Sequence, residues 1–188
     1  MDTARIDFQF VGMDLMIDHG HEHRINNMIW GILLALLAIS FLIGLLFKQF
    51  SMVIITLIVN VIPLILIAGL MGIFGIELRG TTSIIFAVGF VIAVDDTIHF
   101  LSKYRIERKK GFSVDQSIET TILEAGKAIF TTSVILFGGF IVLLHSAFGD
   151  VYSVGFMVSF MILFALLLDL FLVPVLLQLV YKTNKQDA

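Results

Sequence analysis

The chain has no cysteine and only two prolines in 188 residues, and only 14% of its residues are charged. Without cysteine it can form neither a disulfide nor a thiolate-ligated metal site. A soluble domain normally carries about a quarter charged residues, so the shortage of charge excludes an ordinary soluble protein. The sequence also lacks a phosphate loop of the GxxxxGK type, which argues against an ATPase.

Hydrophobic residues make up 59% of the chain, and its mean hydropathy is +1.03. A helix needs about 20 apolar residues to cross a hydrocarbon core of about 30 Å, and it satisfies all its backbone hydrogen bonds while doing so. We therefore predict an all-α integral membrane protein with a five-helix transmembrane bundle. The expected helices lie at about 28–47, 51–76, 81–102, 128–149 and 151–181.

The basic residues alternate between the predicted loops. Nine of the twelve lie on one set of alternate loops: Lys48; Lys103, Arg105, Arg108, Lys109, Lys110 and Lys127; Lys182 and Lys185. Cytoplasmic loops carry the excess of Lys and Arg. We therefore predict that the N-terminus lies outside the cell and that the tail, residues 182–188, is cytoplasmic.

The longest loop contains a helix signal of its own. Ser113 and Gln116 have the spacing of a capping box, and Val114, Ile118 and Ile122 follow at intervals of four. This pattern predicts a cytoplasmic amphipathic segment at 113–126 that lies on the membrane surface. The alternative is a plain connection between two helices.

The first 27 residues are polar and precede the first predicted helix. Residues 5–11 alternate polar and apolar side chains, as a half-buried strand does. One strand cannot form a domain, so residues 1–27 are interpreted as the remnant strand and linker of an external domain. His19, His21 and His23 lie in this linker, but no fourth ligand is apparent, and neither a metal nor a cofactor is expected.

Two adjacent carboxylates, Asp95 and Asp96, lie inside the predicted helix 81–102. One acid at a helix centre costs about 2.5 to 3.5 kcal/mol in a membrane, and all Lys and Arg residues are assigned to loops or tails. His99 follows at i+4 from Asp95 and shares its face of the helix. The pattern favours a proton or ion relay, and a structural polar plug is the alternative.

Other helices carry polar residues that could join such a relay. Asn60, Thr131 and Thr132, with the adjoining Ser133, lie at a matching depth and can hydrogen-bond a carboxyl group. Asp169 lies deeper and is followed by Pro174, so it either joins the relay or organises a bend. Small residues such as Gly89, Gly138 and Gly139 are expected to let helices approach closely.

With these residues in place, the chain resembles the C-terminal half of an RND-superfamily permease of the MmpL-type or "predicted exporter" branch. The resemblance rests on residues 89–105, with the Asp pair in their core at 94–100, on residues 126–133, and on residues 168–170 with Pro174, and it also covers residues 60–63. It implies that the chain supplies helices two to six of that half. The N-terminal half and the porter domains of the same permease would then be partners outside this chain.

The resemblance further implies a secondary active transporter rather than an enzyme. Proton entry through Asp95 and Asp96 would drive export of lipids or other hydrophobic molecules across the bacterial inner membrane, with no role for nucleic acid and with oligomerisation left open. Two other functions share the Asp pair: a sterol-sensing or Patched-like receptor, and a translocation auxiliary of the SecD/SecF kind. The upstream sequence would discriminate between them.

Overall fold

The computed structural model describes residues 13–76 and 80–183, and within these ranges every regular element is a helix. The strand predicted at 5–11 lies outside the described residues. In chain order the elements are α1 (Met13–Phe47), α2 (Phe50–Phe74), α3 (Gly80–Lys109), α4 (Val114–Thr121), the π-helix η1 (Ile122–Gly126), α5 (Lys127–Ile141), the 3₁₀-helix η2 (Val142–His145), α6 (Gly149–Leu167), the π-helix η3 (Leu168–Leu172) and α7 (Val173–Thr183).

Five helical runs within the described residues are long and apolar enough to cross a membrane, which confirms the predicted all-α membrane bundle. They are Ile29–Phe47, Phe50–Phe74, Ser83–Lys109, Val114–His145 and Gly149–Tyr181. The first run is part of α1, which begins at Met13. The described part of the segment interpreted as a linker is therefore helical.

The segment expected to lie on the membrane surface continues directly into a membrane helix. The predicted capping box is confirmed: the Gln116 backbone N–H donates to the Ser113 hydroxyl, and the Gln116 side chain accepts from the Ser113 backbone. After α4 the chain passes through η1 into α5 without a break. Ile118 is buried in the core, so the apolar face of α4 packs on the bundle.

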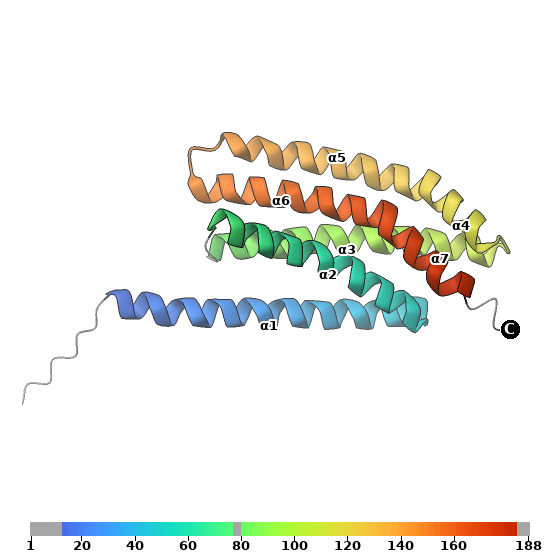
Figure 1. Cartoon of the computed structure of the whole chain (residues 1–188), viewed down its shortest axis with the longest axis horizontal. Helices are drawn as coiled ribbons and strands as arrows, with labels where there is room; N and C mark the ends of the chain where they lie inside the picture. Colours follow the sequence, from blue (N-terminus) through green and yellow to red (C-terminus); the bar gives the residue numbers. More distant parts are fainter. Residues whose placement is uncertain (1–12, 77–79, 184–188) are drawn as a thin grey trace, which may run out of the picture.

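Figure 1 shows the long helices side by side, with α6 between α3 and α5 in contact with both. The closest approach is at Gly89 of α3, where an added Cβ would collide with the Met161 side chain of α6. This confirms Gly89 as a packing residue. Gly138 and Gly139 of α5, by contrast, have no neighbouring atom within 4 Å of an added Cβ.

Burial is uneven across the bundle. In an apolar 18-residue stretch of each span, 44% and 56% of the residues of α2 and α3 are buried, whereas only 6% and 11% are buried in α1 and in the α4–α5 run. Two buried clusters form the core, one around Phe47, Phe100 and Tyr104 and the other around Met157 and Met161. Helices α1 and α5 therefore present apolar side chains to lipid or to a partner.

One end of the bundle collects the positive charge. The turn between α1 and α2 carries Lys48, the last turn of α3 carries Arg108 and Lys109, and Lys110 follows in the turn after it. Figure 1 places these turns and the end of α7 at the same end of the molecule. We call it the basic end.

Candidate functional site

The two adjacent carboxylates of α3 lie in different surroundings. Successive residues of an α-helix point about 100° apart, so Asp95 and Asp96 cannot face the same neighbour. Asp96 is buried, with 7% of its surface exposed, whereas the Asp95 side chain is 72% exposed. The pair therefore combines an enclosed carboxylate with an open one.

The enclosed carboxylate has one side-chain donor, which comes from α5. The Ser133 hydroxyl lies 3.3 Å from Asp96 Oδ2, and Ser133 is itself buried. This is long for a hydrogen bond between two oxygens, which usually spans about 2.5 to 3.0 Å. The contact links α3 to α5 at the level of the Asp pair.

The open carboxylate lies beside the predicted histidine. His99 Nε2 is 3.9 Å from Asp95 Oδ1, and both side chains are exposed. This distance is too long for a hydrogen bond, but a water molecule can bridge it. The predicted pairing of Asp95 with His99 on one helix face is therefore present as a loose contact.

A groove of about 530 Å³ runs between α3 on one side and η1 and α5 on the other, and we call it the α3–α5 groove. Its polar lining consists of Asp95, Asp96, His99 and Thr132, and its other lining residues are apolar. The structure thus brings together three polar residues of α3 and Thr132 of α5 around one groove that is large enough to hold solvent.

The hydroxyl groups of the Thr131 to Ser133 run make different contacts. Thr131 donates to the backbone carbonyl of Lys127 at 2.9 Å, and Thr132 donates to its own helix as well. Thr132 lines the α3–α5 groove and Thr131 does not. Within the described residues, the hydroxyl of this run that reaches the Asp pair belongs to Ser133.

The two remaining predicted residues, Asn60 and Asp169, lie in a second polar cluster. The Thr97 hydroxyl donates to Asp169 Oδ1 at 2.6 Å, and Asn60 Nδ2 is 3.3 Å from the Thr97 hydroxyl. All three residues are at most 1% exposed, and none of them lines the groove. Sequence reasoning missed Thr97, although its position directly after the Asp pair could have marked it.

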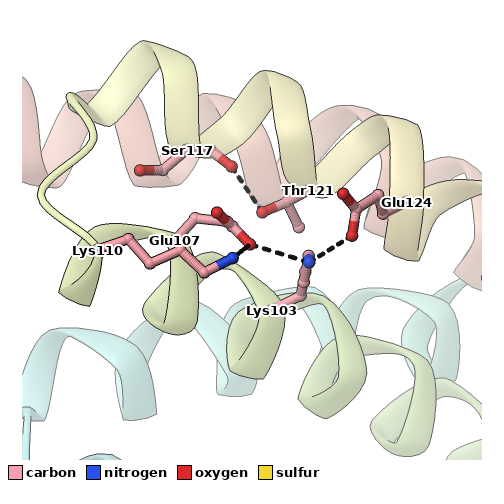
Figure 2. Close-up of polar contacts among 6 residues, drawn as sticks. All are labelled: Lys103, Glu107, Lys110, Ser117, Thr121 and Glu124. Atoms are coloured by element: carbon pink, nitrogen blue, oxygen red, sulfur yellow. Dashed lines mark hydrogen bonds and ion pairs between the residues drawn. The ribbon is translucent and has the colours of Figure 1, made fainter.

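An ion network lies between the groove and the basic end. Lys103 Nζ lies 2.9 Å from Glu107 Oε1 and also pairs with Glu124 of η1, while Lys110 Nζ lies 2.8 Å from the same Glu107 oxygen (Figure 2). Figure 2 also shows the Thr121 hydroxyl bonded to the Ser117 backbone on the facing helix. The network ties the end of α3 to η1.

Groove and network share one face of α3. Asp95, His99, Lys103 and Glu107 follow one another at intervals of four residues, and this spacing stacks side chains along a single stripe of a helix. The stripe leads from an exposed carboxylate inside the span to a lysine and a buried carboxylate at its basic end. The stripe thus lines up titratable groups along α3.

The chain is similar in sequence to proteins of one known family. Residues 16–186 match the sequence profile of the MMPL family. A protein of Methanocaldococcus jannaschii, named only as a membrane protein, is 28% identical over 116 residues, which make up 62% of this chain and 30% of that protein. The chain thus spans less than a third of the length of this curated relative.

Proposed function

The chain belongs to the MMPL family of the RND superfamily, and on that premise we propose that it forms one half of the membrane domain of a proton-driven exporter. In this role Asp95 and Asp96 bind and release the coupling proton. The observation that carries the proposal is the Asp pair itself, with one enclosed and one exposed carboxylate beside the α3–α5 groove.

Charge balance supports a relay over a structural plug. Among the described residues, no Lys or Arg lies within ion-pair distance of Asp95 or Asp96. A buried carboxylate that lacks a cation is costly, and a proton removes the charge. Ser133 supplies one hydroxyl, which orients Asp96 without neutralising it.

A route for the proton follows from the same stripe of α3. Asp96 exchanges its proton with the exposed Asp95, which lies beside His99 in the groove. His99 is followed one turn later by Lys103, and the network of Lys103 and Glu107 marks the exit at the basic end. By the charge rule for membrane proteins, this end faces the cytoplasm.

A second membrane half is the proposed partner on the open side of α5. Only 11% of the residues are buried in an apolar stretch of the α4–α5 run, and Gly138 and Gly139 have no neighbour within 4 Å of an added Cβ. Small residues of this kind suit close packing against another membrane helix. A partner half on this side would also enclose the groove.

The proposed substrates are lipids or other hydrophobic molecules, handled in the cytoplasmic membrane of a prokaryotic cell. Family membership and the largely apolar outer surface support this class. A receptor of the sterol-sensing kind would use the same carboxylates to gate a partner, so proton flux during substrate export separates it from the exporter. A large external domain and a second Asp-bearing half upstream would favour the exporter over a SecD/SecF-like auxiliary.

The test is proton uptake by the intact protein in liposomes that contain a pH-sensitive dye. Asp96→Asn keeps the size of the side chain but cannot titrate, so we expect substrate-dependent proton uptake to fall to the level of empty liposomes. Asp150→Asn is the matched control, because Asp150 is exposed at the first turn of α6. Wild-type proton flux in both Asp95→Asn and Asp96→Asn would refute the relay and favour a receptor.

A further inference from the structure

A second polar cluster lies deeper in the bundle than the groove, where α2, α3 and η3 meet. Asn60 comes from α2, Thr97 from α3 and Asp169 from η3, and these elements are in contact. Each of the three side chains is at most 1% exposed. The cluster is therefore enclosed by protein and is built from three different helices.

This cluster contains more hydrogen-bond acceptor oxygens than donor hydrogens to satisfy them. Asn60 uses its amide hydrogens on the Thr56 carbonyl at 2.8 Å and on the Thr97 hydroxyl at 3.3 Å. These bonds fix the orientation of the Asn60 amide. The single hydrogen of the Thr97 hydroxyl has two acceptors within reach, Asp169 Oδ1 at 2.6 Å and the Ala93 carbonyl of its own helix at 3.1 Å. Among the described residues, Asn60 Oδ1 and Asp169 Oδ2 are then buried without a hydrogen-bond partner.

Among the described residues, no Lys or Arg forms an ion pair with Asp169. α2 carries no charged residue, and the other charged residues of the α6–α7 run, Asp150 and Lys182, lie near its two ends. The titratable group that acts on Asp169 from α3 is Asp96, which is another acid. Unpaired buried acceptors and an unpaired buried charge are each costly, and one positive charge would relieve both.

The helix that carries Asp169 is irregular at this point. Asp169 lies within the π-helix η3, and Pro174 follows in the first turn of α7. Pro63, three residues after Asn60, has no N–H to donate to the carbonyl of Val59. Interrupted membrane helices often supply the carbonyl oxygens that bind Na⁺ or protons in transporters.

We propose that Asn60, Thr97 and Asp169 form a buried binding site for one monovalent cation, a proton or Na⁺, separate from the α3–α5 groove. A single carboxylate matches a single positive charge, and the free oxygens of Asn60 and Asp169 supply neutral and charged acceptors. The site does not depend on the proposed relay, because it is defined by residues that do not line the groove.

The experiment measures thermal unfolding of the intact protein in lipid nanodiscs. In one series Na⁺ replaces choline at constant ionic strength and fixed pH, and in a second series the pH is lowered without Na⁺. An ion that binds only the folded protein raises the unfolding temperature as its concentration rises. A response to Na⁺ at fixed pH identifies Na⁺ as the occupant, and a response to acid alone identifies the proton.

Three variants decide whether the response belongs to this site. Asp169→Asn should abolish it, whereas Asp150→Asn, which removes an exposed carboxylate, should retain it. Thr97→Val keeps the shape of the side chain and should weaken the apparent affinity about tenfold or more, because it removes a hydrogen bond to a charged group. This variant also serves as the test if Asp169→Asn does not fold.

Two results would overturn the proposal. The first is a wild-type protein whose unfolding temperature is indifferent to both Na⁺ and pH. The second is a response of equal size in the wild type, Asp169→Asn and Thr97→Val, because the ion would then act elsewhere.

Discussion

Removal of the Ser133 hydroxyl tests whether the contact between α3 and α5 positions the enclosed carboxylate. In Ser133→Ala, Asp96 loses its one side-chain donor from α5. A hydrogen bond to a charged group is worth about 1.5 to 3 kcal/mol, and the 3.3 Å distance places this one at the weak end. About 1.5 kcal/mol corresponds to roughly a tenfold change in an equilibrium or rate constant.

The assay is proton-coupled transport by the intact protein, with the unfolding temperature measured in parallel. We expect Ser133→Ala to slow transport about tenfold. Thr131→Val is the matched control from the same helix turn, because the Thr131 hydroxyl bonds its own backbone outside the groove, and it should leave transport within about twofold of the wild type. An equal or larger loss in Thr131→Val would refute the assignment of Ser133.

Three further predictions concern packing, orientation and the basic end. Gly155→Ala should destabilise the fold by about 1 to 3 kcal/mol, because its Cβ would lie 2.6 Å from Leu143 Cβ and 2.9 Å from the backbone oxygen of Phe140, whereas Gly69→Ala, which meets no neighbour within 4 Å, should not lower the unfolding temperature. A reporter inserted at Asp150 should behave as external and one fused to the C-terminal tail as cytoplasmic, and reversed signals would contradict the charge rule. Glu124→Gln should speed hydrogen exchange across 114–126, because it removes a bond to α3, whereas the exposed control Glu119→Gln should not.

The five membrane helices could be predicted from the sequence because length and hydropathy alone define them. The position of Asp95 and Asp96 within a span could also be predicted from the sequence. The same holds for the capping box at Ser113, because each of these features depends on residues that lie close together in the chain. The environment of each carboxylate could not be predicted, because it depends on how α3 is rotated against α5 and α6.

The choice among the three hydroxyl residues of α5 illustrates why tertiary contacts escaped the sequence. The hydroxyl that reaches Asp96 belongs to Ser133, the last of the Thr131 to Ser133 run. A π-helix, η1, precedes α5, and its wider turn shifts the register of every residue that follows. A count of 3.6 residues per turn from the amphipathic segment through η1 therefore places the residues of α5 on the wrong face of that helix. The link between Thr97 and Asp169 spans 72 positions, and local patterns do not reveal such pairs.

The unequal surroundings of Asp95 and Asp96 also bear on how this segment can vary during evolution. Position 95 opens into the groove of about 530 Å³, so a glutamate there has room for its extra methylene and keeps an acid in the space. Position 96 borders the same groove but is buried beside Ser133, and a longer side chain there would displace the carboxylate from its contact with that hydroxyl. Two identical letters in the sequence are thus under different constraints, and drift should exchange Asp for Glu at the first position far more readily than at the second.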